Sequence, residues 1–178
     1  MSTDVIELLD TYVGMPDTMQ GGYVAGIAAG SSDGPVRVRI RKATHPGQHL
    51  TRVQDNDSVQ LFRESELVMS VVPDALHVSP RSPLPREAID EAVARPMAWE
   101  PPYPTCIGCG HEVDGLGVEI RPFGDGKHVV GLWSPAPQWA DDKGVIPREF
   151  VWTAFDCVTA YVLFVDPPKI SGGGAVTG

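Results

Sequence analysis

The residues best suited to chemistry are one acid in apolar surroundings and a pair of glycines far upstream. Asp156 lies in the middle of the longest apolar run of the chain, Ile146–Val165. A buried carboxylate costs free energy unless it is paired or belongs to a site. Gly21 and Gly22 open a run of small residues, and N–H groups at a helix start can hold a carbonyl oxygen. A half-buried carboxylate can act as a nucleophile or activate a water.

Three arginines form a second group of candidate residues. Arg37, Arg39 and Arg41 alternate with Val36, Val38 and Ile40. This alternation predicts a strand with one polar face, so the three guanidinium groups should lie in register. The stripe fits either a solvated strand face or a binding site for the phosphates of a ligand.

The chain has three cysteines, and two of them form a C-x-x-C motif. Cys106, Cys109 and the nearby His111 suggest a zinc or redox site. A closed zinc site needs four ligands, however, and the remaining thiol, Cys157, belongs to the apolar run. We therefore expect small buried thiols in a tight glycine-rich turn, with no metal and no cofactor. The odd, low cysteine count and the acidic N-terminus MSTDVIELLD indicate a reducing cytoplasm.

Composition excludes two classes of partner. The chain has 178 residues and a formal net charge of −9, with 14 basic and 23 acidic side chains. This balance argues against binding to a nucleic-acid backbone. The Ile146–Val165 run has membrane-spanning length, but it contains Arg148, Glu149 and Asp156, which argue against a membrane span.

The candidate residues require helices and strands in a definite order. Pro147 and Glu149 favour a helix start, and Asp166-Pro167-Pro168 should end that helix, which we expect to be buried on most sides. A closely packed helix is expected over Tyr23–Ala29, directly after Gly21-Gly22, and should end at Gly30. Asp4–Val13 fits a strand or a short helix. Further strands are expected over Pro35–Ala43, Leu50–Val53, Ser58–Phe62 and Glu66–Val72.

The second part of the chain reverses this order. Pro73–Pro104 is rich in proline and includes one short helical stretch, about Pro85–Ala94, which indicates a linker. Apolar residues alternate before and after Gly124-Asp125-Gly126, which predicts a hairpin. A long loop, Ser134–Gly144, then leads to the apolar helix. The sequence thus predicts an α+β protein with a first half over residues 1–76, a linker over 77–104 and a second half over 105–178.

These features together resemble the hotdog fold, and in particular the PaaI-like acyl-CoA thioesterases. The resemblance rests on a C-x-x-C-G segment, a Gly-Leu pair, a hairpin turn, a Trp-Pro segment and the acid-bearing helix: Cys106–Gly110, Gly115-Leu116, Asp125-Gly126, Trp133–Pro135 and Asp156. It covers about Thr105–Val165, and Gly21–Val72 resembles the other portion of the same fold. The resemblance implies two hotdog-like halves, each an antiparallel sheet wrapped around a long central helix.

The family places an HGG turn at the start of its helix and an acid seven residues after the second glycine. Counting back from Asp156, that turn falls at Pro147-Arg148-Glu149, which is not glycine-rich. Counting forward from Gln20-Gly21-Gly22, the acid falls at Ala29. The first half therefore has the glycine turn without the acid, and the second half has the acid without the glycine turn. The resemblance therefore implies one composite site built from Gly21, Gly22 and Asp156.

The implied activity is hydrolysis of a thioester such as an acyl-CoA. Asp156, Gly21 and Gly22 would be catalytic. Tyr23, Arg37, Arg39 and Arg41 would bind substrate, with the arginines on the coenzyme A phosphates. The alternative is a non-catalytic hotdog module that binds an acyl ligand or a partner protein. The second half lacks strands after Val165, so we expect a homo-oligomer or a partner subunit to complete its sheet.

Overall fold

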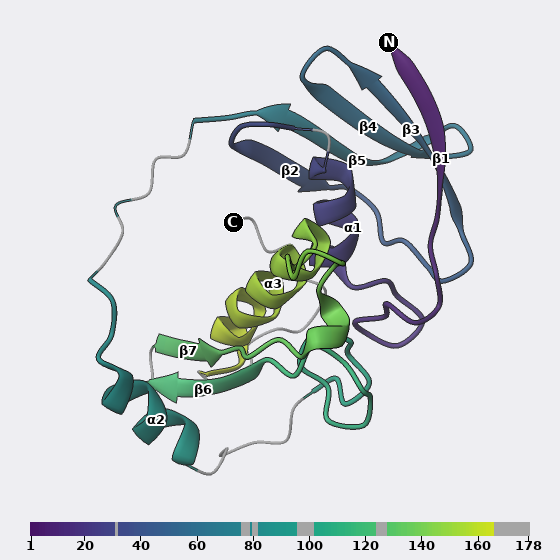
Figure 1. Ribbon diagram of the computed structural model, residues 1–178. Helices are drawn as coiled ribbons and strands as arrows, with labels where there is room; N and C mark the ends of the chain where they lie inside the picture. The colour runs from purple at the N-terminus through teal and green to yellow at the C-terminus, as the bar shows by residue number, and fades with distance from the viewer. Residues whose placement is uncertain (31, 76–78, 80–81, 96–101, 124–127, 166–178) are drawn as a thin grey trace.

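The computed structural model describes residues 1–30, 32–75, 79, 82–95, 102–123 and 128–165, with side chains up to Tyr161. Within these residues the protein has a mixed α+β fold with antiparallel sheets (Figure 1). The elements in chain order are β1 (Ser2–Glu7), α1 (Gly21–Ala29), β2 (Val36–Ile40), β3 (His49–Asp55), β4 (Ser58–Arg63), β5 (Glu66–Pro73), α2 (Arg86–Ala94), β6 (Glu119–Phe123), β7 (His128–Leu132), the short 3-10 helix η1 (Pro137–Trp139) and α3 (Arg148–Val165).

The first part of the chain folds into a five-stranded sheet in the order β1-β3-β4-β5-β2. All neighbouring strands are antiparallel. The predicted helix and the four strands that follow it are confirmed, and strand β1 covers the start of the ambiguous segment Asp4–Val13, up to Glu7. Helix α1 covers one face of the sheet, and together they enclose a core that includes Leu8, Val24, Ala28, Leu50, Leu61 and Met69.

The second part of the chain is smaller. Strands β6 and β7 pair as an antiparallel hairpin, as predicted, although the turn at residues 124–127 lies outside the described residues. Helix α2, from the expected linker, contacts both strands of this hairpin. A second buried cluster joins the hairpin to α3 and includes Cys106, Leu116, Ile120, Ala154, Cys157 and Tyr161. The residues after Val165 also lie outside the described part of the chain.

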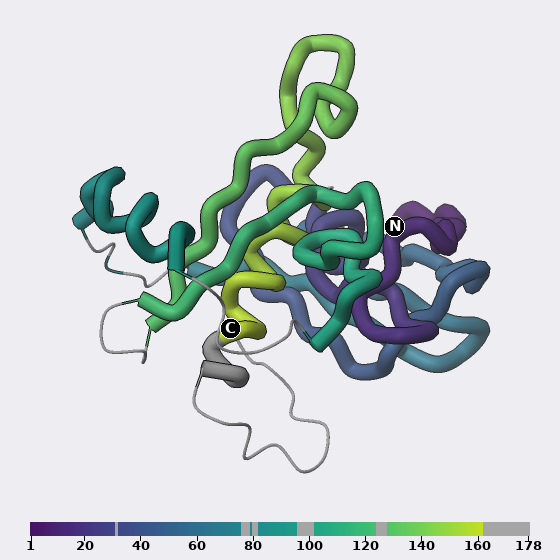
Figure 2. Tube along the Cα trace, turned by 90° about the horizontal axis from the view of Figure 1, so that it is seen from below, coloured from purple at the N-terminus to yellow at the C-terminus, as the bar shows by residue number. Residues whose placement is uncertain are grey.

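Helix α3 lies side by side with α1 and connects the two parts of the molecule (Figures 1 and 2). Its Trp152 packs against the core of the first sheet, while Ala154 and Cys157 belong to the second cluster. The backbones of the two helices approach closely at two glycines. A Cβ on Gly22 would lie 2.5 Å from the Trp152 carbonyl oxygen, and one on Gly26 would lie 2.4 Å from Glu149 Cα. This contact fixes which residues of α3 face the N-terminus of α1.

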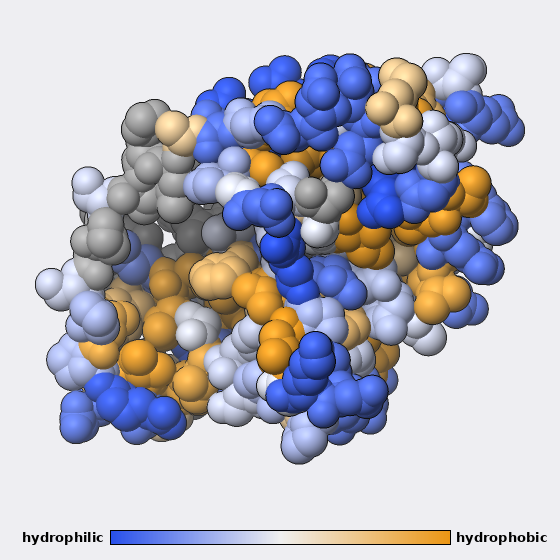
Figure 3. Space-filling view, turned by 45° about the horizontal axis from the view of Figure 1, so that its top comes forward, coloured by the Kyte–Doolittle hydropathy of each residue, from blue (hydrophilic) through white to orange (hydrophobic). Residues whose placement is uncertain are grey.

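The expectation that α3 is buried on most sides is correct for one face and wrong at Phe155, whose exposed fraction is 69%. The segment between β7 and α3 projects from the body of the molecule (light green in Figure 2). Figure 3 shows hydrophobic side chains gathered at the lower left, over α2 and the β6–β7 hairpin. Among the described residues, no helix combines the length and apolar character that crossing a bilayer requires.

Replacing Gly26 by alanine tests the close contact between the helices. Because the new Cβ would overlap the Glu149 backbone, the helices must separate. We expect Gly26→Ala to lower the free energy of unfolding by about 1–3 kcal/mol, which exceeds the gain of up to ~1 kcal/mol in helix propensity. Urea denaturation measures the change.

Gly34→Ala is the matched control, since no atom lies within 4 Å of a Cβ at that position. Its free energy of unfolding should stay within about 0.5 kcal/mol of the wild-type value. Equal stability of the two variants would contradict the proposed packing.

Candidate functional site

The carboxylate of Asp156 lies at the N-terminus of α1. Its Oδ2 accepts a hydrogen bond from the Gly22 backbone N–H at 3.2 Å and a second from the Gln20 side-chain amide at 2.7 Å. Gly21 lies against the same oxygen, since a Cβ there would be 3.6 Å from Oδ2. The structure thus brings together Gly21, Gly22 and Asp156, the three residues of the composite site, although Gly22 and Asp156 are 134 positions apart in the sequence.

Gln20 is the residue of this group that the sequence analysis did not select. It precedes the first turn of α1, and its side-chain Oε1 accepts a hydrogen bond from the Tyr23 N–H at 2.7 Å. Its own backbone N–H donates to the Tyr12 carbonyl at 2.9 Å. The side chain is 4% exposed, so its amide is held in one orientation towards Asp156. Gln20 stands where the family that the sequence resembles has the histidine of its HGG turn, and this position was the signal that could have identified it.

Burial determines the proton affinity of Asp156. Loss of solvent raises the pKa of this carboxyl, while the hydrogen bonds from Gly22 and Gln20 lower it, and the net effect is a raised pKa. A carboxylate with a raised pKa is a stronger base than an exposed aspartate. The site therefore holds a partly buried base beside the positive end of a helix dipole.

Tyr23 belongs to an aromatic cluster next to the site. Its ring stacks on Tyr12 with a centroid separation of 4.2 Å and lies 6.0 Å from Phe150. Burial raises the pKa of the Tyr23 hydroxyl, so the phenol remains protonated at neutral pH. Through these contacts Tyr23 stabilises the junction of α1 and α3.

The three arginines lie on the other face of the sheet. Val36 and Val38 pack against the core beneath α1, so alternation along β2 turns Arg37, Arg39 and Arg41 away from α1. They line a hollow of about 200 Å³ together with Ser70 and Val72. Arg37 forms an ion pair with Asp74 at 2.7 Å. The arginines therefore approach Asp156 only around the edge of the sheet, which β2 forms.

A larger hollow of about 460 Å³ lies where the two parts of the chain meet. It is lined by residues 10–13, Thr105, Ile107, residues 113–114 and Trp139, and neither Gln20 nor Asp156 lines it. The sequence analysis did not anticipate this hollow. The contacts at Gly22 and Gly26 leave no room for an acyl chain between α1 and α3. A Cβ on Gly21 would lie 3.6 Å from Asp156 Oδ2 and 3.3 Å from Ile40 Cδ1, and Ile40 is half exposed.

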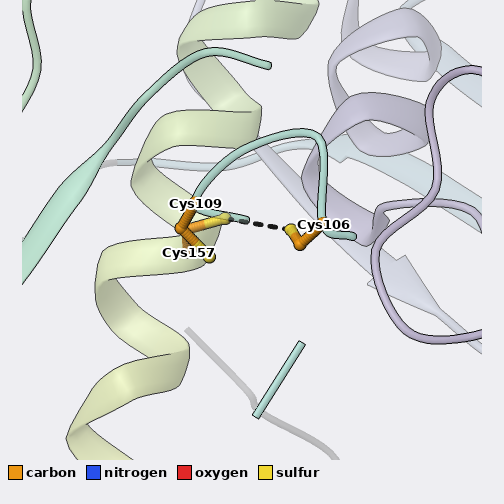
Figure 4. A group of neighbouring side chains, drawn as sticks. All are labelled: Cys106, Cys109 and Cys157. Carbon is orange, nitrogen blue, oxygen red and sulfur yellow. Dashed lines mark hydrogen bonds between the residues drawn. The ribbon is translucent and has the colours of Figure 1, made fainter. Parts of the chain in front are cut away.

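The three cysteines converge on one point (Figure 4). Their sulfur atoms all lie within 4.8 Å of one another, and the Sγ atoms of Cys106 and Cys157 are 3.8 Å apart. Cys106 is buried and Cys109 is partly buried, as expected for thiols in a tight turn, Cys157 is buried on α3, and all three are free. The sequence analysis did not group Cys157 with the C-x-x-C motif, because the sequence does not show that α3 passes beside that loop. His111 is exposed and does not belong to the group.

Hydrogen bonds among the thiols favour one negative charge at Cys106. The neighbouring thiols and the backbone N–H groups of Gly108 and Cys109 lower the pKa of Cys106. The pKa values of Cys109 and Cys157 are raised, chiefly through their hydrogen bonds with Cys106.

Comparison with known proteins gives one structural likeness. No family model matches the sequence, and no curated protein matches it. A crystal structure from Novosphingobium aromaticivorans DSM 12444, described as a "putative thioesterase", is similar with a TM-score of 0.42 and 15% sequence identity. The match covers 70% of this chain and 56% of that one, so the chain spans little more than half the length of its structural neighbour.

The raised pKa of Asp156 predicts how stability depends on pH. The folded carboxyl holds its proton more tightly than the unfolded one, so it favours folding below the unfolded pKa of about 3.9, and this contribution is lost as pH rises through the folded pKa. An asparagine in place of Asp156 would keep an acceptor oxygen without the buried charge. We therefore expect Asp156→Asn to be more stable than wild type at pH 7.

Urea denaturation of both proteins between pH 4 and pH 8 measures this difference, which should shrink towards the acidic end. If Asp156→Asn is less stable than wild type throughout that range, the carboxylate stabilises the fold, and the prediction is wrong.

Proposed function

We propose that this chain is a thioester hydrolase whose reacting centre is the Asp156 carboxylate at the N-terminus of α1. The observation that carries the proposal is the pair of hydrogen bonds from Gln20 and Gly22 to one partly buried carboxylate oxygen. This arrangement keeps a base of raised pKa next to hydrogen-bond donors that suit a developing oxyanion. It also explains why an acid persists in a helix that is otherwise largely apolar.

In the proposed reaction Asp156 acts as a general base. The carboxylate removes a proton from a water molecule, whose oxygen attacks the carbonyl carbon of the thioester. The carbonyl oxygen becomes an oxyanion, which the N–H donors at the start of α1 stabilise. When the tetrahedral intermediate collapses, the C–S bond breaks, and the thiolate that leaves takes up the proton held by Asp156. The products are a carboxylic acid and a thiol.

Substrate binding must rearrange one hydrogen bond before this reaction. In the free protein the Gly22 N–H donates to Asp156, so the same donor serves the oxyanion only after the carboxylate has turned towards water. The Gln20 amide keeps a hydrogen bond to the carboxylate during that change, because its own carbonyl oxygen is fixed by the Tyr23 N–H.

We further propose that the fold consists of two hotdog-like halves, residues 1–76 and 105–178, joined by the segment 77–104. Support comes from the five-stranded antiparallel sheet with α1 on one face, and from the separate buried cluster beneath β6, β7 and α3. A second copy of the chain or a partner subunit would extend the small β6–β7 sheet.

The proposed substrate class is acyl-CoA. Strand β2 is an edge strand, with Ile40 against Gly21 on one side and the three arginines on the other. A long thioester that bends around this edge would place its acyl carbonyl at Asp156 and its phosphates at Arg39 and Arg41. Arginine pairs well with phosphate because its planar fork donates two parallel hydrogen bonds.

A second candidate function is a non-catalytic module that binds an acyl ligand or a partner protein. It is favoured by one observation: in the free protein the donor that would stabilise an oxyanion is occupied by Asp156 itself. This alternative predicts saturable binding of acyl-CoA without any hydrolysis.

Hydrolysis of an acyl-CoA panel separates the two functions. The loss of ultraviolet absorption by the thioester bond is the suitable readout, because reagents that detect free thiols would also react with the three cysteines. We expect wild-type turnover on at least one acyl-CoA, and a kcat about 10²–10⁴-fold lower in Asp156→Asn, because the general base is removed.

Asp142→Asn is the matched control, since this acid is exposed in the loop before α3, and it should retain wild-type turnover. Undiminished turnover in Asp156→Asn would remove Asp156 from the mechanism, while binding without turnover in the wild type would establish the alternative.

The role of the arginines is tested separately with Arg39→Ala/Arg41→Ala. Because two charged contacts to phosphate are lost, we expect the KM for an acyl-CoA to rise about tenfold or more with kcat unchanged. The KM for the corresponding acyl-pantetheine, which lacks these phosphates, should not change. An equal effect on both substrates would place the arginines outside the phosphate site.

A further inference from the structure

The three cysteines have the spacing of ligands around one small cation. The Sγ atoms of Cys106, Cys109 and Cys157 lie within 4.8 Å of one another, and the Cys106–Cys157 separation is 3.8 Å. Zinc binds thiolate sulfur at about 2.3 Å, so two sulfur atoms of a regular tetrahedron around it lie about 3.8 Å apart. The sulfur atoms therefore need little movement to share an ion.

The loop that supplies two of these thiols is fixed by its backbone. The Gly110 N–H donates to the Cys106 carbonyl at 2.7 Å, and the Val118 N–H donates to the Gly108 carbonyl at 2.9 Å. The Ile107 N–H donates to the Val13 carbonyl at 2.9 Å, which ties the loop to the first part of the chain. A ligand-bearing loop held in this way requires little ordering on metal binding.

The third thiol is held against this loop by α3. A Cβ on Gly108 would lie 2.3 Å from Cys157 Sγ, so the glycine is what allows the helix thiol to reach the C-x-x-C pair. On the far side, the Gln20 amide lies 3.7 Å from Cys157 Sγ. Cys157 is therefore fixed from both sides with its sulfur facing Cys106.

The donor set determines the class of metal. Thiolate sulfur is a soft ligand that selects zinc and other thiophilic ions over magnesium or calcium, which prefer oxygen. A protein oxygen also lies beside the group, because the Tyr161 hydroxyl is hydrogen-bonded to Cys109.

We propose that Cys106, Cys109 and Cys157 form a binding site for a thiophilic cation of the zinc class, with three thiolates as protein ligands. Binding releases the thiol protons to solvent and joins the C-x-x-C loop to α3 through the ion. None of the three thiols takes part in the proposed hydrolysis, although the Gln20 amide contacts both Asp156 and Cys157.

Cobalt(II) titration of the full-length, reduced chain tests the site, because cobalt occupies zinc sites and absorbs light when bound by thiolates. We expect one equivalent of cobalt to give a sulfur-to-cobalt charge-transfer absorption, which zinc then removes. Zinc in excess should raise the Tm by about 5 °C or more, as expected for a ligand that binds only the folded chain.

Two variants distinguish this site from a simple C-x-x-C-x-His arrangement. Cys157→Ser should weaken zinc binding at least about tenfold and reduce the charge-transfer absorption, because one thiolate is lost. His111→Ala, which changes the histidine outside the group, should bind cobalt and zinc as the wild type does. A Cys157→Ser variant with wild-type cobalt absorption would overturn the proposal.

A measurement on the wild type alone covers the case in which Cys157→Ser fails to fold. Alkylation of the native protein by iodoacetamide, followed by mass spectrometry, reports each cysteine separately. Zinc should protect all three cysteines together. Protection of Cys106 and Cys109 without Cys157 would overturn the proposal. Absence of both cobalt and zinc binding would overturn it as well, and so would a disulfide between these cysteines that persists under reducing conditions.

Discussion

The structure depends on the close contact between α1 and α3. Gly22 and Gly26 are one helical turn apart, and each lies against the backbone of α3 without space for a Cβ. Because the helices touch at these two points, the rotation and position of α3 are fixed relative to the first turn of α1. Asp156 then faces Gln20 and Gly22, and Cys157 reaches the C-x-x-C loop on the neighbouring side of the same helix.

The Asp156 carboxyl and the three thiols differ in the hydrogen-bond donors that surround them. At Asp156 the loss of solvent outweighs two hydrogen bonds, which leaves a carboxyl that holds its proton more tightly than usual. At the cysteines the donors are the thiols themselves and the backbone of a tight loop. Gln20 contacts both groups, since one amide nitrogen lies 2.7 Å from Asp156 Oδ2 and 3.7 Å from Cys157 Sγ. One buried side chain thus separates the carboxylate from the sulfur atoms.

Local patterns in the sequence predicted the elements well, because helix ends and strand alternation are determined by neighbouring residues. The helix at Gly21–Ala29, the apolar helix around Asp156 and the four strands after Gly30 are present. The pairing of Asp156 with Gly22 came from the family resemblance and not from periodicity. Local patterns could not predict contacts between distant segments. The burial of Gln20, the exposure of Phe155 and the approach of Cys157 to Cys106 depend on how distant elements pack. The same is true of the sheet face on which the arginines lie.

The separation of α1 and α3 along the chain also determines when the site can form. The strands of the first sheet pair with one another within residues 2–73, whereas the hydrogen-bond partner of Gly22 in α1 lies 134 residues downstream. Contacts of such long range form late in folding, because a large loop must close first. During synthesis the glycine face of α1 therefore stays uncovered until α3 leaves the ribosome. The hydrogen bond between Gly22 and Asp156 cannot form before that point.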